Sequence, residues 1–491
     1  MCKIQDMKNF KKYFLFICIL FLSPFILSGC TVSEEKVSEY ERIVSDADLL
    51  IKGKEYSLAL DKLNDATEII PSRVDAFERM VSIFTVKNKP EDAAKVIEES
   101  GGQLSQSDKA KLYTLVGDAY YNLGEFDKAV TNYQLALGMS DKDMSASLGC
   151  AKAYLQIGQI EKAKDLLEKT YEGDMVIESN LLLSYIQALS DTKKAEEILK
   201  GIEPGDKWRE AYTKWNEVLG SLNDDELFNA AKLGKEYVDR GYPYLAIALL
   251  EPKLGKMGEY ADGLYILGKA YYENGDYRKS IDVLQDISTL GDLNQYIYWV
   301  LARDYYQLND INSSIAYYDS AISYGASQAH SAMYKEYLDI LMKENLTEKA
   351  LEVMRGAEKI FTDTWVSLYY VKIYSLRDDS EKFTYYVNKV SYEDLDDSEK
   401  AEFLYSKGSY LIKKSKLDEA QEVLDIFWEL NQYDPRYNLL VAEISIKNND
   451  LEKAKEYAKK AIEYDLKGVV SKEAQTLLAQ IDWFGIIAFV S

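Results

Sequence analysis

The chain has 491 residues, of which 29% are charged, 47% are hydrophobic and 7 are prolines. This balance excludes a disordered chain and leaves little room for long linkers, so a folded, mostly helical protein is expected. The net charge is −23, and removing the four lysines and one aspartate of the first 29 residues takes it to −26. Such a negative field repels phosphate groups, which excludes DNA and RNA as partners.

The first thirty residues carry a basic start and a short apolar run. Four lysines precede an apolar stretch over residues 13–27, which is too short to span a bilayer comfortably. It ends in Leu27-Ser28-Gly29-Cys30, which resembles the lipobox of bacterial lipoproteins. The resemblance implies a signal peptide over residues 1–29, a diacylglycerol thioether and palmitate on Cys30, and a lipidated tether over 30–39. An uncleaved signal anchor is the alternative.

Cysteine usage agrees with that processing. Cys2 and Cys18 would leave with the signal and Cys30 would be acylated, so Cys150 alone would remain. No intramolecular disulfide is then possible in the mature chain. Cys150 lies in a helical pattern, and burial as a small apolar residue is expected. A reactive nucleophile is the alternative.

The rest of the chain repeats itself with a period of 34 residues. Small residues, aromatic residues and turn residues recur in fixed slots, as in Gly234, Tyr237, Gly241, Ala246 and Leu250, then Gly268, Tyr271, Gly275, Ser280 and Leu284, then Ala302, Tyr305, Asn309, Ser314 and Tyr318. Small residues let two helices approach closely, and Gly or Asn permits a tight turn. The pattern resembles the tetratricopeptide repeat. The resemblance implies an all-α fold, a right-handed superhelical solenoid of antiparallel helical hairpins.

About eleven units follow one another along the chain. They begin near Tyr40, Val74 and Ala110 in an N-terminal array over 40–177, and the unit at Trp365 matches poorly. Residues 178–226 are predicted to form a degenerate repeat and an extra helix with Trp208, Tyr212 and Trp215. A C-terminal array is expected over 227–468.

Residues 469–491 are predicted to form a capping helix that ends in an apolar tail from Trp483 to Val490. This tail is too short to cross a membrane. We expect it to dock onto the last repeat. A contact with a partner or with the membrane surface is the alternative.

The residues offer little for catalysis. His330 is the single histidine of the chain and is expected at the surface, so a multi-histidine metal site is excluded. We find no glycine-rich phosphate loop and no nucleophile elbow. No enzyme, cofactor or metal is therefore expected, although a pair of carboxylates among the 82 acidic residues stays possible.

Function should then come from the surface of the array. The resemblance implies that the first helix of each hairpin lines an inner face. On that face we expect four cations, with four aromatic side chains beside them: Lys152, Lys235, Lys269 and Arg303, with Tyr265, Tyr272, Trp299 and Tyr306. A line of cations in an acidic protein is a candidate site for a carboxylate or an acidic peptide. Ordinary solvation, or pairing with acids such as Glu236, is the alternative.

The pattern lacks the Lys-Asn-Asn-Lys-Arg clamp of chaperone-binding tetratricopeptide proteins, so their ligand is not implied. The leading hypothesis is a scaffold or assembly factor for an envelope or surface complex, with a protein or peptide client. The lipid would hold it on the extracytoplasmic face of the cell membrane, in the periplasm or at the cell surface. The alternative is a glycan- or peptide-capturing lipoprotein, which the many Tyr and Trp residues favour because flat rings stack on sugars.

Overall fold

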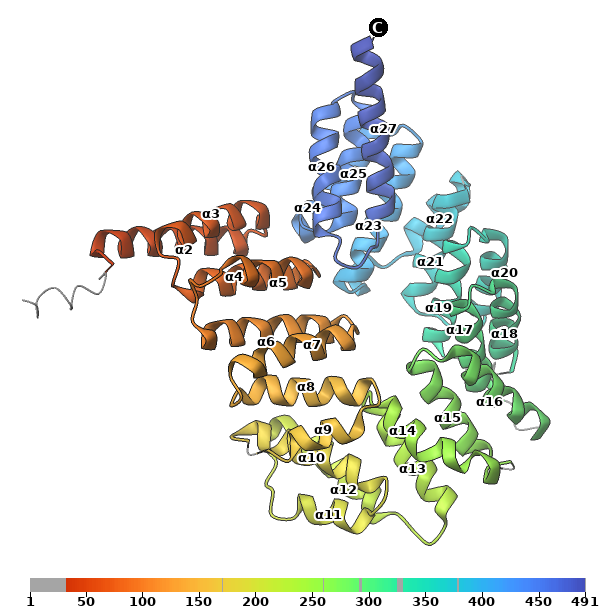
Figure 1. Cartoon of the computed structure of the whole chain (residues 1–491). Coiled ribbons are helices and arrows are strands. Elements are labelled where there is room, and N and C mark those ends of the chain that lie inside the picture. The colour runs from red at the N-terminus through yellow and green to blue at the C-terminus, as the bar shows by residue number, and fades with distance from the viewer. Residues whose placement is uncertain are drawn as a thin grey trace, which may run out of the picture. The chain divides into compact units, whose positions relative to one another are not determined.

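The computed structural model describes residues 32–169, 171–258, 260–290, 294–324, 330–377 and 379–490, of which 288–290 and 483–490 are described by their backbone alone. The signal segment and Cys30 lie outside the described residues. The described residues form α-helices and short 3-10 helices, and no strand is found among them (Figure 1). The predicted all-α fold of antiparallel hairpins is confirmed. The chain divides into two compact units, one up to Val116 and one from Gly117.

The first unit contains two hairpins that match the repeats expected from Tyr40 and Val74. Their helices are α2 (Glu34–Lys52) with α3 (Tyr56–Ile69), and α4 (Val74–Val86) with α5 (Pro90–Glu99). The hydroxyl of Tyr40 donates to a carboxylate oxygen of Asp75 over 2.9 Å. Arg79 forms a second link to Asp48, with Nε and Oδ1 2.7 Å apart. Polar contacts between first helices therefore accompany the packing of neighbouring repeats.

The division between the units falls inside α6 (Gln106–Asn122). The second unit continues with hairpins and a few extra elements: α7 (Phe126–Met139), α8 (Met144–Gln156), α9 (Ile160–Leu167), α10 (Asp174–Ala188), α11 (Thr192–Leu199), α12 (Asp206–Gly220), α13 (Glu226–Asp239), α14 (Pro243–Leu250), η1 (Glu251–Lys256), α15 (Ala261–Glu273), α16 (Tyr277–Leu290), α17 (Gln295–Gln307), α18 (Ile311–Tyr324), α19 (Ser331–Lys343), α20 (Thr347–Ala357), α21 (Thr364–Arg377), α22 (Ser380–Lys389), η3 (Tyr392–Asp394), α23 (Asp397–Lys413), α24 (Leu417–Asn431), α25 (Pro435–Lys447), α26 (Leu451–Tyr464) and α27 (Ser471–Val490).

The small-residue slots lie where the two helices of a hairpin cross. A Cβ added to Gly268 on α15 would come within 2.5 Å of the Leu284 side chain on α16, so a larger residue does not fit there. The turn glycine that follows, Gly275, has a φ of +84°, which a residue with a side chain rarely adopts. The same repeat pattern thus sets both the close crossing and the tight turn.

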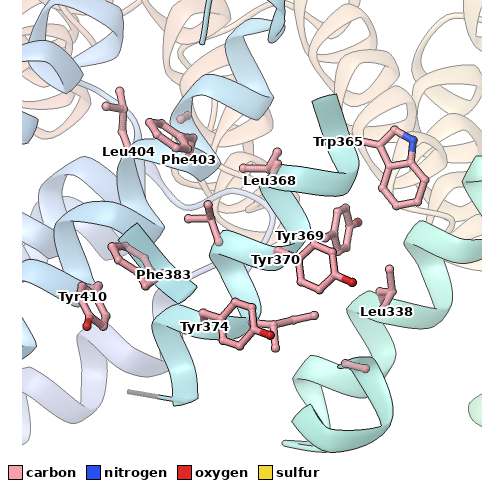
Figure 2. Packing of buried hydrophobic residues seen from close by; sticks show 14 of the residues in the cluster. Leu338, Trp365, Leu368, Tyr369, Tyr370, Tyr374, Phe383, Phe403, Leu404 and Tyr410 are labelled. Atoms are coloured by element: carbon pink, nitrogen blue, oxygen red, sulfur yellow. The ribbon is translucent and has the colours of Figure 1, made fainter. Parts of the chain in front are cut away.

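The poorly matching repeat at Trp365 replaces the small residue with an aromatic one. Phe383 on α22 occupies that slot and stacks on Tyr410 of α23, with ring centroids 3.8 Å apart and planes 22° apart. Figure 2 shows this pair within a core that also holds Trp365 and Tyr370. The crossing is therefore filled by a ring that reaches into the next hairpin.

The segment 178–226 holds most of α10, which begins at Asp174, and the helices α11 and α12. Trp215 on α12 is fully buried and meets the Tyr185 ring edge-on at 4.6 Å, and its indole nitrogen donates to the Ser184 hydroxyl over 2.8 Å. Residues on the two sides of this segment also meet. The side-chain amide of Gln156, at the end of α8, donates over 2.7 Å to the carbonyl of Gly241, in the turn between α13 and α14. The extra helix is thus part of the packed array.

The closing helix α27 packs onto the last repeat with its first turns. Ala474 and Ile481 are buried, and the Lys455 ammonium lies 2.7 Å from the Asp482 carboxylate. The side chains of the apolar tail, from Trp483 onward, lie outside the described side chains, so its docking stays a prediction. Within the described residues, no helix combines the length and the apolar character needed to cross a bilayer.

Candidate binding surface on the first helices

The four predicted cations all lie on first helices, and the structure pairs each of them with an acid. The Lys152 ammonium of α8 lies 2.8 Å from the Glu178 carboxylate of α10. Lys235 of α13 and Lys269 of α15 share one carboxylate, Asp239, with 3.3 Å for the Lys269 contact. Lys152 and Lys269 therefore link neighbouring first helices, whereas Lys235, whose side chain is 65% exposed, pairs within α13.

Arg303 of α17 is held by Glu336 of α19 in the same manner. Its Nε donates to one carboxylate oxygen over 2.7 Å and its NH2 group to the other. Burial opposes the charge of Arg303, but the hydrogen bonds and the charge of Glu336 outweigh it and raise the pKa of the guanidinium. Burial likewise opposes ionisation of Glu336, but Arg303 and the Tyr318 hydroxyl lower the pKa of its carboxyl. The pair stays ionised at neutral pH.

Glu236, the acid that the sequence suggests as a partner for these cations, forms ion pairs with two other basic residues. Its buried carboxylate lies 2.7 Å from Arg240 on the same helix and 3.2 Å from Lys214 of α12. The predicted cations are thus ion-paired with acids other than Glu236, which lie on a neighbouring first helix in every case except the Lys235 pair within α13.

The predicted aromatic side chains lie beside the cations. Arg303 lies over the Trp299 ring at 4.2 Å and near the Tyr272 ring at 6.0 Å. Tyr265 and Tyr306 line two separate hollows, described next. Lys152 lines neither hollow, because it belongs to the earlier helix α8.

One hollow, the α13–α15 pocket, has a volume of about 540 Å³. Its wall combines three aromatic side chains and three lysines: Phe228, Tyr260, Tyr265, Lys232, Lys235 and Lys269. The Asp239 carboxylate, which also lines the pocket, holds two of these lysines. The burial of Asp239 is outweighed by those two lysines, which lower the pKa of its carboxyl. Apolar walls with a few polar groups are typical of ligand sites.

The other hollow, the α15–α19 pocket, has a volume of about 600 Å³. Aromatic and basic side chains again dominate its wall: Tyr272, Tyr306, Tyr318, Arg303, Lys335 and Lys343. Two of the basic groups have acidic partners, because Arg303 pairs with Glu336 and Lys335 lies 3.4 Å from Glu399. The two pockets thus repeat one chemistry along four successive first helices.

Two further lysines in the pocket walls, which were not among the predicted cations, form no ion pair with a described carboxylate. Lys232 lies 5.3 Å from the Phe228 ring centroid, and Lys343 lies 5.4 Å from that of Tyr306. Among the residues that the structure describes, neither has a carboxylate within ion-pair distance. Counted from the first residue of its unit, Ser331, Lys343 stands at position 13, one of the positions that the tetratricopeptide resemblance assigns to the inner face, so the sequence could have indicated it. Lys232 stands at position 6 of its unit, which the resemblance does not assign to that face.

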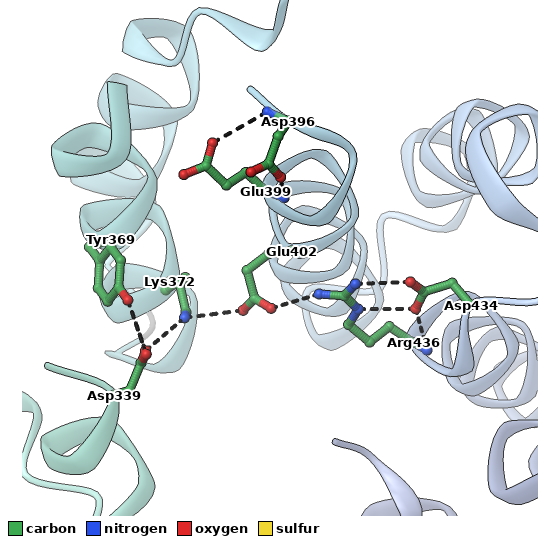
Figure 3. Close-up of polar contacts among 8 residues, drawn as sticks. All are labelled: Asp339, Tyr369, Lys372, Asp396, Glu399, Glu402, Asp434 and Arg436. Atoms are coloured by element: carbon green, nitrogen blue, oxygen red, sulfur yellow. Dashed lines mark hydrogen bonds and ion pairs between the residues drawn. The ribbon is translucent and has the colours of Figure 1, made fainter. Parts of the chain in front are cut away.

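Further along the array, charged side chains on successive first helices form ion pairs with one another. Figure 3 shows a chain of contacts in which Asp339 of α19, Lys372 of α21, Glu402 of α23 and Arg436 of α25 alternate in sign. Lys372 lies 3.2 Å from Asp339 and 3.4 Å from Glu402, and Arg436 lies 2.9 Å from both Glu402 and Asp434. The side chains of Lys372 and Arg436 are only 19% and 13% exposed. In this charge ladder every charge has a partner of opposite sign.

The remaining candidate residues are isolated. His330 is exposed, and its Nε2 lies 2.6 Å from the Tyr296 hydroxyl. Cys150 is fully buried, as predicted, and burial raises the pKa of its thiol to about 12. Across the described part of the chain, no three His, Cys, Asp or Glu side chains gather closely enough to hold a metal ion.

Comparison with known proteins bears on the repeats. Models of the tetratricopeptide repeat match residues 110–143, 262–289 and 435–467. The chain is 22% identical over 316 residues to TPR repeat-containing protein MJ1428 of Methanocaldococcus jannaschii, covering 62% of this chain and 51% of that protein. It thus spans about half the length of that relative. It is also 22% identical over 337 residues to TPR repeat-containing protein YpiA of Bacillus subtilis, covering 63% of this chain and 77% of that protein.

Solved structures with a similar arrangement include yeast Tom70, at 13% identity and a TM-score of 0.36, with 92% of this chain and 97% of that chain covered. The structure of Naa15/Naa10 bound to HypK-THB matches at 14% identity and a TM-score of 0.38, with 90% and 96% covered. The matched models and the relatives, together with the 34-residue period, lead to one conclusion: this chain contains tetratricopeptide repeats.

Proposed function

We propose that this protein is a lipid-anchored scaffold that binds a segment of a client protein on the first helices α13–α19. One observation carries the proposal. The α13–α15 and α15–α19 pockets follow one another along successive first helices, and both have aromatic walls and basic groups. Aromatic and arginine side chains at the centre of a surface supply most of the energy in protein interfaces. A row of such pockets fits an extended protein segment better than it fits one compact ligand.

Membrane attachment is the second part of the proposal and rests on the sequence. The lipobox at residues 27–30 precedes α2 by a few residues, so a lipid on Cys30 would hold the array within a short tether of the bilayer. Tethering raises the effective concentration of the array beside a membrane-bound client without any new contact. Assembly of an envelope or surface complex is the role that this arrangement suits.

The client-binding surface can be tested by photo-crosslinking in the native membrane. A photoreactive phenylalanine analogue placed at Tyr306 lies in the α15–α19 pocket, whereas the same analogue at Tyr324 lies 60% exposed on the second helix of the same hairpin. We expect one stoichiometric client to crosslink at Tyr306 and not at Tyr324. Equal labelling of both positions, or no protein product at Tyr306 despite full recovery of the chain, contradicts the proposed surface.

The anchor needs a separate test. Growth with an alkyne fatty acid should label the wild-type protein and should not label a Cys30→Ser variant. The variant should also move from the membrane fraction to the soluble fraction. Unlabelled wild-type protein would remove the lipid from the proposal and leave the binding surface standing.

Capture of a small ligand is the second candidate. The α13–α15 pocket favours it, because about 540 Å³ with Phe228, Tyr260 and Tyr265 in the wall could hold a sugar ring or a short peptide. Isothermal titration with glycan and peptide panels distinguishes this role from the scaffold, since only ligand capture predicts heat from a free sugar.

A further inference from the structure

We infer that the client segment is extended and carries two acidic side chains about nine positions apart, one for Lys232 and one for Lys343. This inference rests on the proposed function and adds the chemistry of the client. It replaces the binding cations chosen from the sequence, which are Lys152, Lys235, Lys269 and Arg303.

Charge balance within the two pockets selects these lysines. The α13–α15 pocket is also lined by the carboxylates of Asp239 and Asp262. Asp239 pairs with Lys235 and Lys269, so Lys232 is the lysine of this pocket without an ion pair among the described residues. In the α15–α19 pocket, Arg303 and Lys335 have acidic partners and the Asp339 carboxylate pairs with Lys372, which leaves Lys343 without an ion pair among the described residues. A carboxylate that enters either pocket therefore meets one open ammonium group, with which it can form a charge-assisted hydrogen bond.

The rings beside the two lysines add an apolar contact. The Phe228 ring lies beneath the Lys232 ammonium and the Tyr306 ring beside that of Lys343, which holds each charge at the pocket wall. The methylene groups of a glutamate can pack on such a ring while its carboxylate reaches the lysine. A free inorganic anion lacks this apolar part, so the geometry favours a side chain of a protein segment.

Helix spacing sets the separation of the two acids. Lys232 lies on α13 and Lys343 on α19, the first and the last of four successive first helices and therefore three helix steps apart. At roughly 10 Å for each helix-to-helix step, the two lysines are about 30 Å apart. An extended chain advances about 3.3 Å per residue, so about nine residues cover that span.

The test uses the full-length lipoprotein in detergent and fluorescent fourteen-residue peptides of serine and threonine that carry two glutamates three, six, nine or twelve positions apart. Fluorescence anisotropy should give the tightest binding at a separation of nine. Lys232→Gln and Lys343→Gln should each weaken that peptide about tenfold, the scale of one lost charge-assisted hydrogen bond. Lys459→Gln, an exposed lysine on α26, is the matched control and should leave binding unchanged.

Two results would overturn the inference. Affinity that does not depend on the separation, or that survives in both lysine variants, contradicts the two-acid requirement. A client that crosslinks at Tyr306 through a segment without paired acids also contradicts it, yet leaves the scaffold role in place. Circular dichroism of each variant confirms that a loss of binding does not come from unfolding.

Discussion

A buried carboxyl on α17 should make the stability of the array depend on pH. Asp304 is fully buried, and one of its oxygens accepts a hydrogen bond from the Ser280 hydroxyl over 2.6 Å. The other oxygen, Oδ1, has no hydrogen-bond partner among the described residues. Burial raises the pKa of this carboxyl to about 7. The folded protein therefore binds the Asp304 proton more tightly than the unfolded chain does.

The sign and size of the effect follow from that shift. Because the pKa is raised in the folded state, stability is fully present below the unfolded pKa of about 3.9 and is lost as the pH rises towards 7. At about 1.4 kcal/mol per pKa unit, ionisation of Asp304 costs the folded state roughly 4 kcal/mol above pH 7. Asp304→Asn removes the titration, so its gain in stability over the wild type should grow by about 2–3 kcal/mol between pH 5 and pH 8.

Hydrogen–deuterium exchange of α16–α18 is the suitable assay, because repeat arrays unfold in parts and a single global midpoint is poorly defined. Exchange rates, corrected for the intrinsic pH dependence, give the local opening free energy at both pH values. Asp310→Asn is the control, since backbone and side-chain hydrogen bonds from Ser313 lower the pKa of Asp310 and keep it ionised throughout this range. A difference between Asp304→Asn and the wild type that stays constant from pH 5 to pH 8 would refute the reasoning.

Three further outcomes are expected. Gly268→Ala should lower the opening free energy of α15 and α16, measured by hydrogen–deuterium exchange, by about 1–3 kcal/mol because its Cβ would lie 2.5 Å from a neighbouring side chain, whereas Gly356→Ala, with open space around it, should not lower that of α20. Arg436→Ala should cost about 3 kcal/mol because it leaves the Asp434 carboxylate without its cation and Glu402 with Lys372 alone, against less than about 1 kcal/mol for Arg42→Ala in an exposed pair. Native Cys150 should resist a thiol reagent at pH 8 and react once urea unfolds the chain, since it is fully buried and its thiol pKa is about 12; rapid reaction of the native protein would contradict this.

The repeat pattern was sufficient to predict the hairpins, because the residues that form them lie within one period of the chain. Gly268 and Leu284 meet inside one hairpin, and Gly275 makes the turn between its helices. Even the poorly matching unit at Trp365 folds as a hairpin. Its crossing contact, Phe383 on Tyr410, was not predictable, since it depends on a ring from the following repeat.

The sequence by itself determined which charged residues occupy the first helices. The tertiary structure decided which of them have an ion-pair partner. Lys235, Lys269 and Arg303 recur in one slot, yet Asp239 and Glu336 neutralise them. Lys269 and Arg303 find these acids 30 and 33 residues away, on neighbouring first helices. Such pairs form only when stacked repeats bring the first helices side by side, because a long side chain reaches whichever carboxylate the packing places near it. The repeat period fixes a residue's slot, and the packing fixes its partner.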